Sequence, residues 1–153
     1  MKSFLLSLLG ICVVGVTVAY VTYRMIGPPD RSVPCDPEAL PEHYVCLATV
    51  REWDDDEILW VDARPEKDWE NDGVEGSILI NDQKEWLDQE FGFMSRMSAD
   101  PKPKVVVYCN QSGCGSSKYV ANQLRERHAG TFGFEVFVLE GGASALQAER
   151  ESK

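Results

Sequence analysis

Short apolar runs, separated by polar segments, recur along residues 44–153. Runs of four apolar residues with no polar alternation predict strands that are buried on both faces. Three runs have this pattern, namely Ile58–Val61, Val105–Tyr108 and Val136–Leu139. Ser77–Ile80, which follows a glycine-rich turn, predicts a weaker strand, and Tyr44–Leu47 predicts a short edge strand.

Segments of helical period alternate with these strands. The predicted helices are Ala48–Trp53, Glu66–Glu70, Lys84–Phe91, Ser117–His128 and Ala143–Glu151. The third carries Trp86, Leu87 and Phe91 as its apolar residues, and Ser116 or Ser117 is expected to cap the fourth. Strands that alternate with helices predict an α/β fold, with a mainly parallel sheet flanked by helices on both faces.

The N-terminal segment differs from the rest of the chain. Ser3–Tyr23 holds 21 residues without a charge, enough for a helix to cross a bilayer. We therefore predict a transmembrane anchor over residues 1–26, a proline-rich linker over 27–43 and one domain over 44–153. A cleaved signal peptide is the alternative interpretation. For an uncleaved signal-anchor, we expect a single-pass membrane protein whose soluble domain lies outside the cytoplasm.

The charge and composition of the chain argue against some classes of function. The 153 residues carry a formal net charge of −10, and residues 32–153 alone hold 12 basic and 24 acidic side chains. Such an acidic domain argues against nucleic acid as a partner, because phosphate contacts need clustered Lys and Arg. Neither His nor Cys occurs at zinc-site spacing, so we expect no metal and no cofactor.

Two of the five cysteines border the linker. Cys35 lies in the proline-rich segment, and Cys46 lies near the start of the domain. In an oxidising compartment the two can form a disulfide that ties the linker to the domain. Two unrelated thiols, with Cys46 simply buried, are the alternative, because spacing alone does not fix distance.

The segment with the clearest chemical character follows the strand Val105–Tyr108. Cys109 ends this strand, and the small or polar residues Asn110–Gly115 separate it from the next helix. Glycines in such a loop allow backbone N–H groups to turn inward, and a helix N-terminus adds partial positive charge. We expect a thiol in this setting to have a lowered pKa and to act as a nucleophile. An inert turn after a buried cysteine is the alternative.

Three parts of the domain resemble the rhodanese family. They are Ile58–Asn81 with its Val61–Pro65 segment, Val105–Cys109 with the following helix, and Val136–Gly142 with its Gly-Gly turn. The resemblance implies a rhodanese-like sheet of five strands and sulfurtransferase activity. Cys109 matches the nucleophile that carries a persulfide. The loop that surrounds its sulfur is matched by Asn110, Gln111, Ser112, Gly113, Cys114 and Gly115.

The family resemblance also implies the reactants. A small donor, thiosulfate or a persulfide, would pass a sulfane sulfur through Cys109 to a thiol acceptor. However, Asn110–Ser117 contains no basic residue, so thiosulfate is expected to be a poor donor. A phosphatase of the C-x5-R type is excluded, because Gly115 stands where the arginine would be.

The sequence also suggests roles for three further residues. Cys114 either fills the loop or resolves a sulfur adduct on Cys109, which would make the protein a thiol–disulfide redox protein. Asp62 and Arg64 are expected to orient loops as structural support. The remaining alternative is a catalytically weak rhodanese-fold module that binds a partner, of unknown identity, at the membrane.

Overall fold

The computed structural model describes residues 15–18, 20–21, 34–98, 102–110 and 114–152. The chain forms two units, Met1–Arg31 and Ser32–Lys153. In the first unit, residues 15–18 and 20–21 are helical. Within the described ranges, no helix combines the length and hydropathy that a membrane span requires. Because most of residues 1–33 lie outside these ranges, the anchor over 1–26 stays a prediction.

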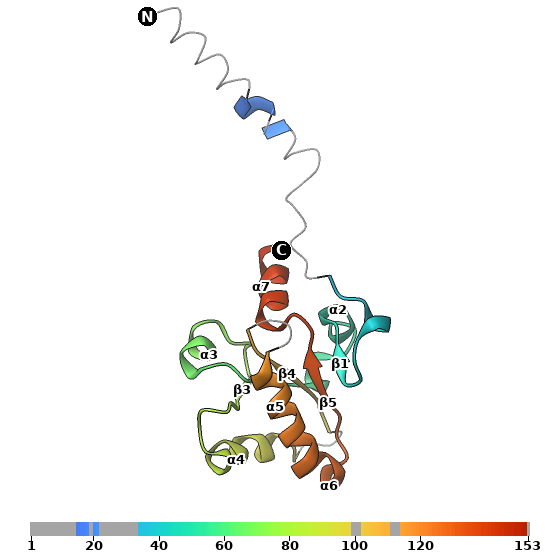
Figure 1. Ribbon diagram of the computed structural model, residues 1–153, viewed down its shortest axis with the longest axis vertical. Coiled ribbons are helices and arrows are strands. Elements are labelled where there is room, and N and C mark those ends of the chain that lie inside the picture. The colour runs from blue at the N-terminus through green and yellow to red at the C-terminus, as the bar shows by residue number, and fades with distance from the viewer. Residues whose placement is uncertain (1–14, 19, 22–33, 99–101, 111–113, 153) are drawn as a thin grey trace, which may run out of the picture. The chain divides into compact units, whose positions relative to one another are not determined.

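The second unit is built on a parallel sheet of five strands (Figure 1). The strands are β1 (Tyr44–Val45), β2 (Ile58–Asp62), β3 (Ile78–Leu79), β4 (Lys104–Tyr108) and β5 (Val136–Leu139). Their order across the sheet is β1-β5-β4-β2-β3, and every neighbouring pair is parallel. The predicted α/β fold with a five-stranded parallel sheet is therefore confirmed.

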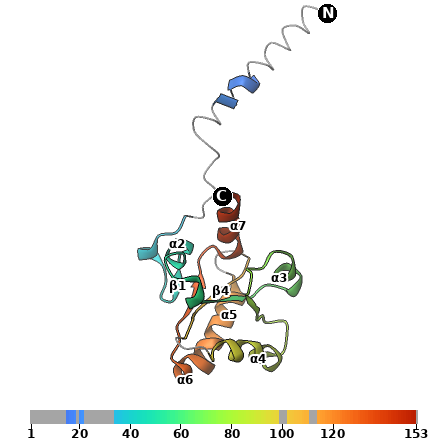
Figure 2. The same ribbon diagram turned by 180° about the vertical axis from the view of Figure 1, so that it is seen from behind.

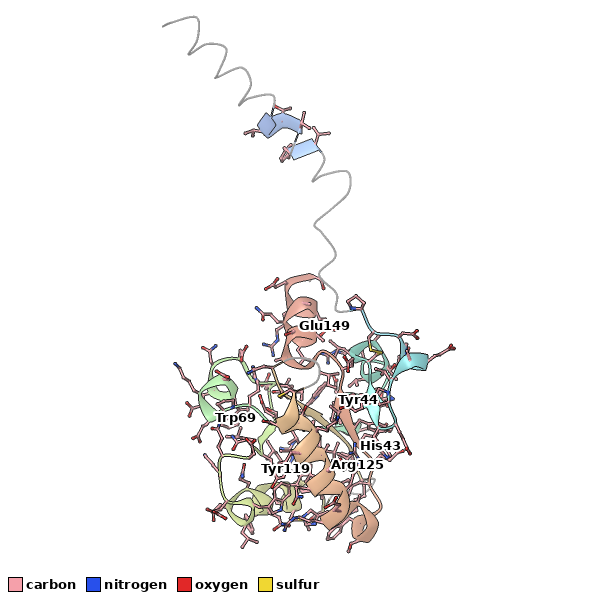
Figure 3. All side chains as sticks on the ribbon, in the orientation of Figure 1. His43, Tyr44, Trp69, Tyr119, Arg125 and Glu149 are labelled. Atoms are coloured by element: carbon pink, nitrogen blue, oxygen red, sulfur yellow. A yellow bond between two sulfur atoms is a disulfide. The ribbon has the colours of Figure 1, made fainter. Side chains whose placement is uncertain are left out.

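Helices lie between successive strands, and one more follows the last strand. They are α2 (Leu47–Val50), α3 (Glu66–Asp72), α4 (Trp86–Arg96), α5 (Gly115–Leu124), α6 (Gly130–Phe132) and α7 (Gly142–Ser152). A π-helical turn, Arg125–Ala129, continues α5, and 3-10 turns occur at Pro37–Ala39 and Asp55–Glu57. After α5, the guanidinium of Arg125 donates hydrogen bonds to the carbonyl of Val136 in β5 (Figure 3).

The alternation of side chains along β2 and β4 produces two cores, one on each face of the sheet. Leu59 and Val107 face the core that α4 and α5 cover. Trp60 and Val106 face the other core, which α2 and α7 cover. In agreement with this arrangement, α5 lies in front of the sheet in Figure 1 and behind it in Figure 2. Helices therefore flank both faces, as predicted.

The third predicted helix, Lys84–Phe91, has different bounds in the structure. α4 does not end at Phe91 but continues through Gly92 to Arg96, and it buries Gln89 and Phe93. Leu87 and Phe91 are 76% and 82% exposed. A longer helix places Phe93, four residues after Gln89, on the stripe that meets the sheet, and a stripe of period 3.6 cannot also include Leu87 and Phe91.

Cys35 and Cys46 form a disulfide, with 5.8 Å between their Cα atoms. The sequence left open whether these two cysteines are bonded or are unrelated thiols, and in the structure they are bonded. The bridge spans 11 positions and includes the 3-10 turn Pro37–Ala39. Cys46 is 2% exposed, so the bridge fixes the preceding chain to the buried edge of the domain beside β1.

Replacement of Cys35 with serine is expected to lower the free energy of unfolding by about 2–3 kcal/mol, because the unfolded chain loses a loop closure. Urea unfolding in non-reducing buffer measures the difference from wild type. In reducing buffer the two chains should unfold at the same urea concentration. A difference that persists there would show that the serine acts on the folded state and not through the bridge.

Candidate functional site

Cys109 lies at the carboxyl end of the central strand β4. The neighbouring strand β2 ends at the same edge, where Asp62 pairs with Tyr108. From β2 the chain moves outward to β3, whereas from β4 it moves to β5 on the other side. In open parallel sheets, ligands bind outside the carboxyl ends of the strands at such a switch point. The topology therefore brings Cys109 to the position where α/β folds bind ligands.

The N-terminus of α7 holds the backbone that follows β4. Its Ala143 N–H donates to the carbonyl of Cys109 at 2.6 Å. The N–H and hydroxyl of Ser144 both donate to the carbonyl of Asn110, at 3.2 and 2.9 Å. These contacts join positions 34 apart, so no local sequence signal identified Ala143 or Ser144 as part of the site.

The turn before α7 explains how that helix reaches Cys109. Gly141 and Gly142 have φ angles of 78° and 53°. This left-handed region is accessible to glycine at little cost and disfavoured for other residues. The Gly-Gly pair thus turns the chain directly from the end of β5 onto the end of β4.

Cys109 and Cys114 are joined by a disulfide, with 6.4 Å between their Cα atoms. Cys109 is 2% exposed, whereas Cys114 is half-buried and directly precedes α5. Asn110 is exposed, and Gly115 is the first residue of α5. The structure thus brings Cys109 together with three of the six predicted loop residues, whereas Gln111, Ser112 and Gly113 lie outside the described residues.

Ser117 contacts both cysteines of this bridge. Its hydroxyl lies 3.5 Å from the sulfur of Cys109 and 3.3 Å from the carbonyl oxygen of Cys114. The predicted capping role is wrong, because the N-cap of α5 is Cys114 and its side chain makes no capping bond. Ser117 lies within the first turn, and this places its buried hydroxyl at the site.

In the reduced protein, replacement of Ser117 with alanine is expected to slow alkylation of Cys109 about fivefold near neutral pH. A hydroxyl donor to the thiolate contributes about 1 kcal/mol, and its loss also moves the midpoint of the rate–pH profile upward. Iodoacetamide alkylation as a function of pH measures both effects. Ser116→Ala is the matched control, because the Ser116 hydroxyl faces Asp82 instead. Equal midpoints in the two variants would refute the contact.

Asp62 and Arg64 form a buried ion pair at the end of β2. The side chains are 0% and 4% exposed, and Arg64 Nη2 lies 2.8 Å from Asp62 Oδ2. Arg64 Nη1 also donates to Asp72 at 2.8 Å. Burial alone would lower the pKa of Arg64, but the hydrogen bonds and charge of Asp62, with Asp72, raise it above its ordinary value. Two carboxylates therefore already balance this guanidinium.

Tyr108 lies in the same group of buried polar side chains as Asp62 and Arg64. Its hydroxyl accepts the backbone N–H of Val74 at 3.0 Å, and its ring lies 5.4 Å from Arg64 Cζ. Burial, reinforced by a hydrogen bond with Asp62, raises the pKa of Tyr108 to about 12. The cluster thus links the ends of β2 and β4 to the turn that precedes β3.

The stability provided by the neutral Tyr108 phenol is expected to be lost at high pH. Its pKa is near 10 when unfolded and about 12 when folded, so the contribution is complete below pH 10 and disappears as pH rises through about 12. Absorbance titration of the folded protein should show a component near pH 12 that is missing in Tyr108→Phe. Tyr119→Phe should retain it, and its loss in that control would reassign the group.

No three His, Cys, Asp or Glu side chains among the described residues cluster closely enough to hold a metal ion. His128 lies in the π-helical turn, with its Nε2 2.5 Å from Glu90 Oε1 of α4. It therefore links the π-helical turn to α4, on the face of the sheet that α4 and α5 cover, and takes no part in the site around Cys109.

Comparison with known proteins gives one family. The family model for the rhodanese-like domain matches residues 48–149. No curated protein matches the chain. Among solved structures, the BH2092 protein from Bacillus halodurans is 18% identical over 71% of this chain and 73% of its own, with a TM-score of 0.48. The N-terminal domain of a putative ATP/GTP binding protein from Clostridium difficile 630 is 20% identical over 71% and 97%, with a TM-score of 0.43.

The match of the family model covers about two thirds of the chain. It includes β2 to β5, the cysteine after β4 and the Gly-Gly turn that leads to it. On the strength of that match, the chain belongs to the rhodanese-like domain family.

Proposed function

We propose that this protein is a sulfurtransferase that moves a sulfane sulfur from a persulfide donor to a thiol acceptor through a Cys109 persulfide. The position of Cys109 carries the proposal. It lies in a rhodanese-like domain, at the carboxyl end of the central strand, and its sulfur is within hydrogen-bonding distance of the Ser117 hydroxyl in the first turn of α5. A helix N-terminus and a hydroxyl donor both favour the thiolate.

The transfer proceeds in two displacements on sulfur. The Cys109 thiolate attacks the outer sulfur of a donor R–S–SH, forming Cys109–S–SH and releasing the thiolate RS⁻. An acceptor thiolate then attacks the outer sulfur of Cys109–S–SH, which regenerates the Cys109 thiolate and leaves a persulfide on the acceptor. No electron carrier is needed, because a sulfane sulfur is handed on at the same oxidation level.

A persulfide is a better candidate donor than thiosulfate. Thiosulfate is a dianion, and Asn110–Ser117 offers it no basic side chain. Arg64, at the neighbouring strand end, is already engaged by Asp62 and Asp72. A persulfide carries at most one negative charge on the sulfur that is transferred, so its binding there depends less on such a cation. The expected ordering of donors thus follows from the absence of a basic side chain in this loop.

Direct sulfur loading tests the proposal. The full chain is reduced with dithiothreitol, desalted and exposed to glutathione persulfide or thiosulfate, and the tryptic peptide Val105–Lys118 is then weighed. A persulfide adds about 32 Da to this peptide, and we expect this adduct, or sulfide released from it, to appear faster with glutathione persulfide than with thiosulfate. Cys109→Ser should abolish it, whereas Cys35→Ser should not. If no donor leaves an adduct or leads to sulfide release, the sulfurtransferase proposal fails, and the alternative of a binding module with the rhodanese fold is favoured.

We also propose that residues 1–26 anchor this activity to a membrane, with the domain outside the cytoplasm. The uncharged stretch Ser3–Tyr23 and the Cys35–Cys46 disulfide support this placement, because disulfides persist in oxidising compartments. Protease treatment of intact cells tests it. Digestion of the domain only after lysis would place it in the cytoplasm and overturn the proposal.

A further inference from the structure

Cys114 takes no part in the transfer just described, yet the structure bonds its sulfur to that of Cys109. We infer that Cys114 attacks the Cys109 persulfide and expels its sulfane sulfur as sulfide. The chain would then have a second activity, the dithiol-dependent reduction of sulfane sulfur. This inference rests on the proposed function, since it begins with the Cys109 persulfide.

The backbone positions of Cys109 and Cys114 are fixed by the strand and helices around them, and not by the loop that connects them. Cys109 follows β4, and its carbonyl accepts the Ala143 N–H of α7. Cys114 directly precedes α5, and the Ser117 hydroxyl lies 3.3 Å from its carbonyl oxygen. A strand, two helices and their hydrogen bonds thus fix the two backbone positions. The Cα atoms of Cys109 and Cys114 lie 6.4 Å apart, and their sulfurs are bonded. That separation lies within the range of ordinary disulfides.

Proximity favours this reaction over transfer to an external thiol. A thiol positioned within the same fold acts at an effective concentration that dissolved thiols do not reach. In addition, Cys109 is 2% exposed, so an external thiol has poor access to the inner sulfur of its persulfide, where attack releases sulfide, and is restricted to the outer sulfur. Cys114 reaches that inner sulfur, as the bond between them demonstrates.

The resolving step balances in atoms and electrons. Cys109–Sγ–S⁻ and the Cys114 thiol react to give the Cys109–Cys114 disulfide and HS⁻. The bond between Cys109 Sγ and the sulfane sulfur breaks, the Sγ–Sγ bond forms, and the proton of Cys114 leaves on the sulfide. The sulfane sulfur gains two electrons, and the two cysteine sulfurs lose one each.

A dithiol reductant must then restore both thiols. Its first thiolate attacks the sulfur of Cys114, which is the more exposed of the two, and the Cys109 thiolate leaves. The hydroxyl of Ser117, 3.5 Å from Cys109 Sγ, favours that leaving group. The second thiol of the reductant resolves the mixed disulfide on Cys114. Dithiols should therefore sustain turnover better than monothiols.

A single-turnover experiment on the full chain tests the inference. The protein is reduced, desalted and mixed with one equivalent of glutathione persulfide, and sulfide and the Val105–Lys118 peptide are measured together over time. In wild type we expect sulfide to appear as the peptide becomes about 2 Da lighter than its reduced form. In Cys114→Ser we expect the peptide about 32 Da heavier to accumulate, and sulfide release to fall at least about tenfold.

Controls separate the inference from the proposed function. Cys109→Ser should give neither the adduct nor sulfide, and Cys35→Ser should behave as wild type. A lasting adduct in wild type, without sulfide, would refute the role of Cys114 and leave the sulfurtransferase intact. Absence of both adduct and sulfide in wild type would refute the proposed function itself. Since wild type alone distinguishes these outcomes, the test does not depend on the folding of Cys114→Ser, and Cys114→Ala gives a second variant.

Discussion

Replacement of Arg64 with leucine is expected to lower the free energy of unfolding by about 3–5 kcal/mol. Asp62 is fully buried, and Arg64 donates to it through its backbone N–H, Nε and Nη2. Leucine would leave that carboxylate in the interior without a cation. Urea unfolding, followed by tryptophan fluorescence, measures the loss.

The second partner of Arg64 supplies the matched control. Asp72 also pairs with this guanidinium at 2.8 Å, but its side chain is 44% exposed. Exposed ion pairs contribute about 0–1 kcal/mol, so Asp72→Asn should cost no more than that. The double variant Asp62→Asn, Arg64→Leu should be more stable than Arg64→Leu, because the uncompensated charge is gone. Equal costs for Arg64→Leu and Asp72→Asn would show that burial of the pair does not matter.

The strands that form the centre of the fold are predictable because their signal is local. Runs such as Val105–Tyr108 are apolar at every position, since a central parallel strand is buried on both faces. The sequence therefore predicts β2, β4 and β5 within one residue, and with them the point where Cys109 leaves the sheet. Partly exposed edge elements are less determined: β1 is only Tyr44–Val45, shorter than the predicted strand.

The position of Cys109, the nucleophile of the proposed function, is predictable for the same local reason, but the residues that surround it are not. Cys109 follows a strand and precedes a loop and a helix, which are consecutive in sequence. Ala143 and Ser144 reach the site only because α7 folds back from β5 onto β4. Ser117 has the sequence signature of a helix cap, and only the start of α5 at Gly115 turns its hydroxyl toward the sulfur. Contacts of this kind depend on the tertiary structure.

The sharpest case of this limit is α4, where two phenylalanines two residues apart have opposite environments. Phe93 is fully buried, and its ring centroid lies 5.7 Å from that of Phe134 in an edge-on contact. Phe91 is 82% exposed. Hydrophobicity alone does not distinguish them, since each falls in an apolar stretch and only the register of the helix against the sheet decides which one faces inward.

Phe93→Ala is accordingly expected to lower the free energy of unfolding by about 3–5 kcal/mol, because it removes a buried ring and leaves a cavity between α4 and the sheet. Phe91→Ala, on the same helix, should change it by less than about 0.5 kcal/mol. Urea unfolding of both variants beside wild type measures the contrast. A similar loss in the two would mean that Phe91 also packs inward, and would overturn the helix register described for this face of the sheet.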